Sequence, residues 1–325
     1  MTRAAMSKPS THIFLAGEMV EVLSAAEIAA TLDGAGALDG VPFMPEMLAF
    51  CGRRMKVHRR ADKTCVEGHY GLRKLGGTVL LEAARCDGAA HDGCQRNCMI
   101  FWKEAWLKPA AANSAVAAPA RTLADELADA RARKRLAALP IRDGDRYRCQ
   151  STALMAATAP QSAWNVTHLV ADVRRGELSL AGFVAMIGRT LVNRARGLVG
   201  LQDLGALAGD HGQAPAGDLG LQPGEWVRVL SAEAIQATLG PDGRNRGLSF
   251  EPEMSRYIGG VYQVEFVVRR IILEETGQMA KLNRTVALKT LACAGACAKN
   301  CPRANTLYWR EAWLERVAVN AVAAE

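Results

Sequence analysis

The stretch GEMVEVLSAAEIAATL at residues 17–32 returns as GEWVRVLSAEAIQATL at residues 224–239. The match continues without a gap to FWKEAWL at residues 101–107, which returns as YWREAWL at residues 308–314. Paired positions are 207 residues apart, and more than a third of them are identical. Similarity of this length predicts two copies of one domain. We call residues 17–107 repeat one, and residues 224–325 repeat two with its tail.

Each repeat alternates apolar and polar residues in three short segments, the pattern of half-buried strands. The pattern predicts strands at residues 19–22, 53–60 and 78–81, and at residues 226–229, 262–268 and 285–288. A cysteine-rich loop follows the third strand, and a short helix carrying Trp102 and Trp106 is expected to close repeat one. The predicted fold class is α+β, with two small β-rich domains, SH3-like in outline, joined by a helical central segment.

Helix signals are clearest outside the strands. Ser24 and Glu27 form an S-x-x-E capping box, whereas repeat two keeps only its cap residue, Ser231. Thr122 can cap a charged helix. A second helix, starting at Ser179, has an apolar face and a basic face. We expect this second helix to pack against the two domains, the alternative being contact with a membrane or a nucleic acid.

These signals divide the chain into five parts. The predicted parts are an N-terminal tail (1–16), repeat one (17–107), an Ala-rich linker with its helix (108–140), a helical central segment carrying Cys149 (141–223), and repeat two with its tail (224–325).

The overall composition limits the class of protein. Half of the residues are apolar and 22% are charged, a balance typical of a globular chain. No apolar run is long enough to span a bilayer, and the N-terminus lacks the pattern of a secretory signal. We therefore expect a cytoplasmic protein with no membrane partner. The net charge of +7 comes from scattered basic residues, which is weak support for a nucleic-acid partner.

Nine cysteines carry the strongest chemical signal. In a reducing cytoplasm they predict metal binding or redox chemistry rather than a disulfide framework. Cys86 and Cys94 align with Cys293 and Cys301. The third cysteine of repeat one, Cys98, follows the second shared cysteine, Cys94, by four residues. In repeat two the third cysteine, Cys297, precedes the shared Cys301 by four residues. That spacing predicts two thiols one helical turn apart.

Two sets of four cysteines follow from this spacing. In repeat one the nearest fourth ligand is Cys65, whose counterpart in repeat two is Ile272. The second set must therefore take its fourth ligand from elsewhere, and Cys149 is the free candidate. The predicted metal ligands are Cys65, Cys86, Cys94 and Cys98 at the first site, and Cys149, Cys293, Cys297 and Cys301 at the second.

Two further residues have weaker claims as ligands. Cys51 aligns with Ile258, which predicts a buried apolar position. His91 could replace a cysteine as a ligand, although Ala298 stands at its position in repeat two.

The spacing of the cysteines favours iron–sulfur over zinc. Structural zinc sites usually contain C-x2-C knuckles, and the chain has none. Wider spacing suits the separated ligands of a polynuclear cluster, so the predicted cofactors are two clusters of the four-iron four-sulfur type (4Fe–4S), with zinc as the alternative. Two interpretations of the neighbouring aromatic residues are open. They would shield a cluster from water, or they belong to the hydrophobic core of each repeat.

The strings GEWVRV (224–229), LDGVPFMPEM (38–47), RCDGAAHDGC (85–94) and FWKEAWL (101–107), with YRCQST (147–152) between the repeats, resemble a family of bacterial proteins with this duplicated layout. The resemblance implies no fold or reaction.

No other catalytic motif stands out, and the paired acidic residues (Glu46 and Glu253, Glu104 and Glu311) are interpreted as anchors of turns. The first hypothesis is an iron–sulfur protein in redox or cluster-based chemistry of small-molecule, including secondary, metabolism. Its partner would be a small-molecule substrate or a redox protein, and whether it is an enzyme stays open. The second hypothesis is a zinc-stabilised, non-catalytic module that binds nucleic acid or protein.

Overall fold

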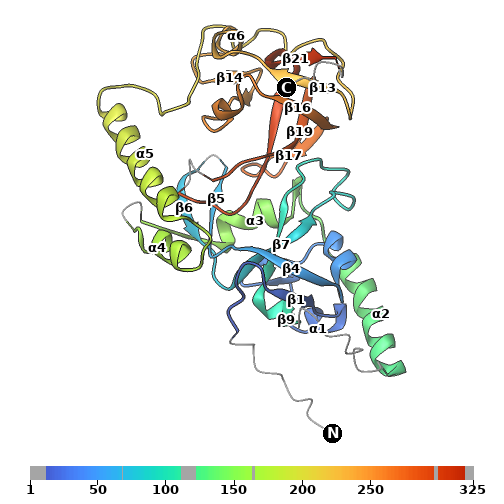
Figure 1. Cartoon of the computed structure of the whole chain (residues 1–325). Coiled ribbons are helices and arrows are strands. Elements are labelled where there is room, and N and C mark those ends of the chain that lie inside the picture. Colours follow the sequence, from blue (N-terminus) through green and yellow to red (C-terminus); the bar gives the residue numbers. More distant parts are fainter. Residues whose placement is uncertain (1–11, 68, 111–121, 163–164, 296–298, 319–325) are drawn as a thin grey trace.

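The computed structural model describes residues 12–67, 69–110, 122–162, 165–295 and 299–318. Two similar β-rich halves, one from each repeat, lie at opposite ends of the molecule (Figure 1). The helix α3 (Gln150–Ala157), from the central segment, lies between them. The chain is therefore α+β with two similar domains, as the duplication predicts.

Each repeat forms a curled antiparallel sheet of five strands with the same strand order. In repeat one the order is β8-β7-β4-β1-β9, and in repeat two it is β20-β19-β16-β13-β21. The bounds in repeat one are β1 Met19–Val22, β4 Arg54–Arg60, β7 Thr78–Arg85, β8 Met99–Lys103 and β9 Leu107–Pro109. Those in repeat two are β13 Trp226–Val229, β16 Val261–Val267, β19 Thr285–Ala292, β20 Thr306–Arg310 and β21 Leu314–Val317. The three strands predicted in each repeat are confirmed, with the third extending further than expected.

Short helices connect the strands in equivalent places. They are α1 Ala25–Ala29, η1 Pro45–Phe50 and η2 Glu104–Trp106 in repeat one, and α6 Ala232–Gln236, η3 Met254–Tyr257 and η4 Glu311–Trp313 in repeat two. Ser24 and Glu27 form the predicted capping box, and Ser231 caps α6 alone. The predicted closing helix is only the single turn η2, because Trp102 belongs to strand β8, where sheet pairing overrides the helical spacing of the two tryptophans.

A hairpin arm leaves each repeat and reaches toward the other. In repeat one the arm is β5 (Lys63–Val66) with β6 (His69–Lys74), and in repeat two it is β17 (Arg270–Ile272) with β18 (Met279–Lys281). Two-residue strands complete the fold: β2 Ala37–Leu38, β3 Val41–Pro42, β10 Arg142–Asp143, β11 Arg146–Tyr147, β12 Ala159–Pro160, β14 Arg244–Asn245 and β15 Leu248–Ser249. The exchange of arms brings residues of both repeats to one interface.

Three further helices besides α3 come from the chain between the two repeats. These are α2 (Leu123–Ala137), capped by Thr122 as predicted, α4 (Thr167–Arg174) and α5 (Leu180–Leu198), capped by Ser179. The expectation that the apolar face of α5 packs against the domains is wrong. Leu180, Val184 and Leu191 are 72%, 68% and 61% exposed.

Tryptophans fill the core of both sheets. Trp102, Trp106, Trp309 and Trp313 are fully buried. Phe43 packs edge-on against Trp106, and their counterparts in repeat two, Phe250 and Trp313, pack in the same way. Aromatic pairs of this kind add to the burial energy of each core.

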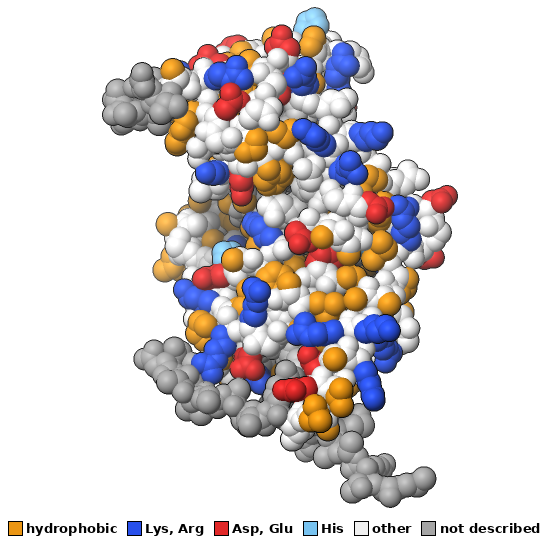
Figure 2. Space-filling model, turned by 90° about the vertical axis from the view of Figure 1, so that its right-hand side faces the viewer, with side chains coloured by type: hydrophobic (Ala, Val, Ile, Leu, Met, Phe, Trp, Pro, Cys, Tyr) orange, Lys and Arg blue, Asp and Glu red, His pale blue; other side chains and the backbone are white. Residues whose placement is uncertain are grey.

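No described helix is both long and apolar enough to cross a membrane. On the face shown in Figure 2, Lys and Arg side chains are spread over both halves, with Asp and Glu among them. This distribution matches the scattered charge of the sequence.

Candidate metal centre

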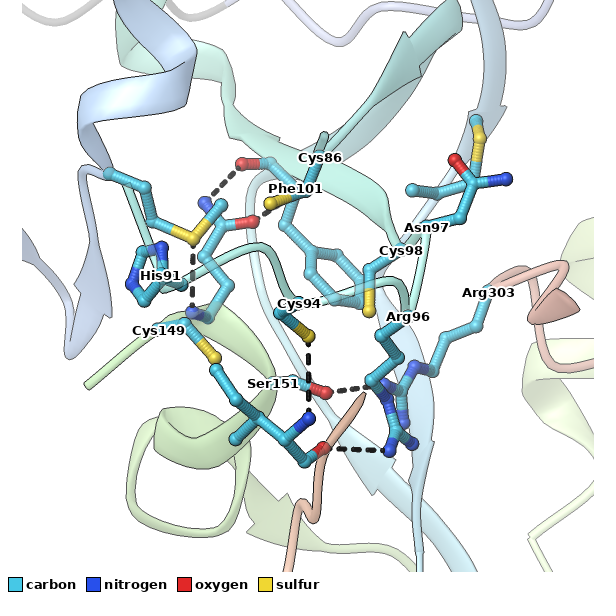
Figure 3. A pocket seen from close by; sticks show the side chains of 14 residues that line it. Cys86, His91, Cys94, Arg96, Asn97, Cys98, Phe101, Cys149, Ser151 and Arg303 are labelled. Carbon is cyan, nitrogen blue, oxygen red and sulfur yellow. Dashed lines mark hydrogen bonds between the residues drawn. The ribbon is translucent and has the colours of Figure 1, made fainter. Parts of the chain in front are cut away.

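Four cysteines line one cavity between the repeats. Cys86, Cys94 and Cys98 come from the loop after β7, and Cys149 precedes α3. Figure 3 shows the four sulfur atoms around this cavity, together with Arg96 and Arg303. We call it the cysteine cavity.

The grouping differs from the predicted ligand sets. Cys149 lines the cavity of the first site, not the second. Cys65 lies at Cys301 of repeat two, with 3.3 Å between the two sulfur atoms. The reason is the exchange of hairpin arms, which carries Cys65 away from its own repeat. Cys297, in the second predicted set, lies outside the described residues.

The cysteine loop of repeat one contains no helix between Cys86 and Cys98, so the prediction of two thiols one helical turn apart in this repeat is wrong. The loop of repeat one is closed by the amide of Cys86, which donates to the carbonyl of Cys98 at 2.9 Å. Gly88 has a φ of +67°, and a Cβ there would meet the carbonyl oxygen of Cys94 at 2.0 Å. Gly295, its counterpart, has a φ of +73° and the same close approach to Cys301, at 2.2 Å. Glycine is required at both positions because the loop folds back on itself.

Gln150 anchors Cys149 at the cavity. Its side-chain oxygen accepts from the amide of Phe101 at 2.8 Å, and its side-chain nitrogen donates to the carbonyls of Phe101 and Pro42 at 2.9 and 3.2 Å. Gln150 is 4% exposed, so these bonds lie in the protein interior. They fix the N-terminus of α3, and with it Cys149, against the edge strand β8 of repeat one.

The two repeats contact each other reciprocally through their arms. The amide of Ile272 donates to the sulfur of Cys94 at 3.3 Å, and the amide of Cys65 donates to the sulfur of Cys301 at 3.2 Å. Because each pair is related to the other by the 207-residue offset, the interface has the self-complementary pattern of a two-fold dimer.

Two buried arginines repeat the same relationship. Arg96 donates to the carbonyl of Ile272 at 3.1 Å, and Arg303 donates to the carbonyl of Cys65 at 3.1 Å. Arg303 also forms a 2.7 Å ion pair with Glu274, and Arg96 forms one with Glu67 at 2.7 Å. Burial would raise the pKa of Glu274, but the charge and hydrogen bonds of Arg303 outweigh it and hold that pKa below its usual value.

The thiols of the cavity are shielded from water. Burial raises the pKa of Cys94, raises that of Cys149 to about 11, and raises that of Cys86 further. Without a cation to stabilise thiolates, these three cysteines are protonated at neutral pH.

His91 lines the cavity but its ring nitrogens have other partners. Nδ1 lies 2.6 Å from a carboxylate oxygen of Glu46, and Nε2 lies 3.1 Å from the carbonyl of Arg148. Burial would lower the pKa of His91, but the hydrogen bond and charge of Glu46 raise it overall. His91 is therefore held as the partner of Glu46 and is not offered as a metal ligand.

The other cysteines within the described residues do not line the cavity. Cys51 is buried in the core of repeat one, which confirms its predicted apolar position. Cys293 donates to the carboxylate of Glu253 at 3.2 Å. Glu253 also accepts from the amide of Ala294 at 2.6 Å, so it anchors the cysteine loop of repeat two.

Sequence reasoning missed Arg96, Arg303, Glu67 and Glu274. Each arginine is identical to its counterpart in the other repeat, and so is each glutamate. Identity between the copies at polar positions outside the cysteines was the signal that could have found them.

Comparison of the chain with models of protein families, with curated proteins and with solved structures found no match. Among the described residues, no three His, Cys, Asp or Glu side chains lie close enough together to hold a metal ion.

Proposed function

We propose that this chain is an iron–sulfur protein whose cysteine cavity holds one 4Fe–4S cluster. The ligands are Cys86, Cys94, Cys98 and Cys149. The observation that carries the proposal is that four thiols, three from the loop after β7 and one from the start of α3, line one cavity. Four thiolates are the usual ligand set of such a cluster.

The sequence spacing of the cysteines favours a cluster over zinc, because the chain has no C-x2-C knuckle. Zinc in a structural site gathers four ligands around one ion at about 2.0–2.3 Å. A cluster separates its ligands because each thiolate binds a different iron atom.

The charges around the cavity also fit a cluster. A cluster with four thiolates is anionic, and Arg96 and Arg303 both line the cavity. The amide of Ile272, which donates to the sulfur of Cys94, is the kind of hydrogen bond that tunes a cluster's potential. Burial of these groups in a dry interface would limit loss of iron to solvent.

The second predicted set has less support. Cys149 lines the first cavity, and Cys65 lies against Cys301 instead. Of the second set, Cys293 is bonded to Glu253 and Cys297 lies outside the described residues. We therefore propose one cluster and assign neither Cys65 nor Cys301 to it.

The bound cluster would supply one-electron redox chemistry or a Lewis-acidic iron. The chain's own part is to supply thiolates, exclude water and balance charge with two guanidinium groups. We propose a role in redox or cluster-based chemistry of small molecules in a reducing cytoplasm, where the thiols stay available for iron.

Anaerobic purification followed by iron, zinc and acid-labile sulfide analysis tests the proposal. We expect about four iron and four sulfide per chain, with a broad absorbance band near 400 nm. Cys149→Ala removes one ligand and should lower the iron content strongly, whereas Cys51→Ala removes a buried thiol of the core and should leave it unchanged. A colourless protein that retains zinc in proportion to the chain would refute the proposal and favour the zinc-stabilised module.

A further inference from the structure

Cys65 and Cys301 form a thiol pair at the interface of the two repeats. Their sulfur atoms are 3.3 Å apart, and the amide of Cys65 also donates to the sulfur of Cys301 at 3.2 Å. A disulfide requires a sulfur–sulfur distance of about 2.05 Å, so the two atoms need approach by only a little over 1 Å. The residues are 236 apart in the chain and belong to different repeats.

We propose that Cys65 and Cys301 are a reversible dithiol–disulfide pair that covalently joins the two repeats when the protein meets a peroxide. This proposal does not depend on the cluster, because neither Cys65 nor Cys301 is among the proposed cluster ligands.

The surroundings favour one thiolate in the pair. The hydrogen bond from Cys65 is the main cause that lowers the pKa of Cys301 to about 6, and the charge of Arg303 acts in the same direction. The same bond raises the pKa of Cys65 well above its usual value. The pair therefore holds one shared proton at neutral pH, and a thiolate is the reactive form of cysteine.

Access to the pair is from the side of Cys65. Cys65 is half-buried, whereas Cys301 is 3% exposed. Cys65 first passes its proton along the hydrogen bond to the thiolate of Cys301. The thiolate of Cys65 formed in this way attacks one oxygen of hydrogen peroxide, the oxygen–oxygen bond breaks, and hydroxide leaves. Cys65 is then a sulfenic acid.

The second step forms the bond between the repeats. Hydroxide takes the proton of Cys301 and becomes water, and the thiolate of Cys301 attacks the sulfur of Cys65. The sulfur–oxygen bond breaks, hydroxide leaves, and the disulfide forms. The two sulfur atoms together lose two electrons, which reduce one peroxide to water and hydroxide.

The duplication provides a control inside the same chain. At the equivalent contact in the other half, Cys94 faces Ile272, which cannot form a disulfide. Ile272→Cys would place a second thiol pair in the same geometry. If the geometry alone determines bridging, this variant should gain a second bridge, between Cys94 and residue 272.

Peptide mapping of the full-length chain tests the proposal. The metal-free chain is treated with hydrogen peroxide, its free thiols are blocked with N-ethylmaleimide, and it is digested with trypsin without reductant. Cys65 and Cys301 fall in the tryptic peptides TCVEGHYGLR (64–73) and NCPR (300–303), each with a single cysteine. We expect these two peptides joined, two hydrogens lighter than their sum, and separated again by dithiothreitol.

Stability gives a second measurement on the same sample. The oxidised wild type should unfold at a higher urea concentration than the reduced wild type, and Cys65→Ser should show no such shift. Recovery of both peptides as blocked thiols, or of either cysteine bridged elsewhere, would overturn the proposal. The proposal is also overturned if both thiols are bound to metal in the purified protein and stay reduced after the metal is removed and peroxide is added. Iron content is measured separately, so failure here leaves the cluster proposal standing.

Discussion

The guanidinium of Arg303 donates to the carboxylate of Glu274 at 2.7 Å, and their side chains are 4% and 1% exposed. Removing one partner of such a pair leaves an uncompensated buried charge. We predict that Arg303→Met lowers the free energy of unfolding by about 3–5 kcal/mol, measured by urea denaturation of the metal-free protein.

The matched control is an exposed pair of the same type. Arg228 and Glu315 are 3.1 Å apart, with side chains 36% and 49% exposed. Arg228→Ala should cost about 0–1 kcal/mol. Equal effects of the two substitutions would mean that Arg303 is not buried with its partner.

The Glu46–His91 pair predicts a pH dependence of stability. Because the pKa of His91 is raised above 6.5, its contribution is complete below pH 6.5 and is lost as the pH rises through the raised value. Burial would raise the pKa of Glu46, but the hydrogen bond from His91 lowers it below 4.5, so this contribution is lost as the pH falls through the lowered value. The pair should therefore stabilise the fold most between pH 4.5 and 6.5.

Glu46→Gln tests this pH dependence directly. The variant keeps the shape of the side chain but removes the charge, and we expect it to cost about 1.5–3 kcal/mol at pH 6. The difference from wild type should shrink as the pH rises above 6.5. A difference that stays constant from pH 6 to pH 9 would contradict the raised pKa of His91.

In each repeat, one buried tryptophan donates its indole N–H to the hydroxyl of a threonine. Trp106 donates to the hydroxyl of Thr31 at 2.9 Å, and Trp313 donates to that of Thr238 at 3.0 Å. Thr31→Val leaves a buried indole N–H without a partner, and we predict a loss of about 1–3 kcal/mol. Thr238→Val should cost a similar amount. Thr31→Ser keeps the hydroxyl and should recover most of the loss, as thermal denaturation can show.

Gln150 is predicted to act on iron binding without touching the metal. Gln150→Leu removes three buried hydrogen bonds to the edge of repeat one, so Cys149 loses its fixed position. We expect iron content to fall although all four cysteines remain, and the free energy of unfolding to fall by about 1–3 kcal/mol. Gln150→Glu keeps the acceptor oxygen and should retain more iron than Gln150→Leu. Full iron content in Gln150→Leu would show that Cys149 is placed by other contacts.

Local features of the fold could be predicted from the sequence. Strand β1 begins and ends where the alternation of residues 19–22 predicts. The caps at Ser24, Thr122 and Ser231 are also confirmed, because a cap depends on neighbours within a few residues. The buried position of Cys51 followed from its alignment with an apolar residue.

The grouping of the cysteines could not be predicted in the same way. Cys65 precedes Cys86 by 21 residues, which suggested one site, but an arm carries Cys65 to the other repeat. Local periodicity contains no information about which copy of a duplicated sheet an arm will contact. Trp102 and Trp106 have helical spacing, yet pairing with β7 holds Trp102 in a strand.

The exchange of arms has a consequence for how the molecule unfolds. Each repeat has its own core, but the partners of Cys65 and Ile272 lie in the other repeat. Neither repeat can therefore lose its structure without exposing buried polar groups of its neighbour. The two copies are expected to melt as one cooperative unit, so a calorimetric trace should show a single transition and substitutions in either repeat should shift it together.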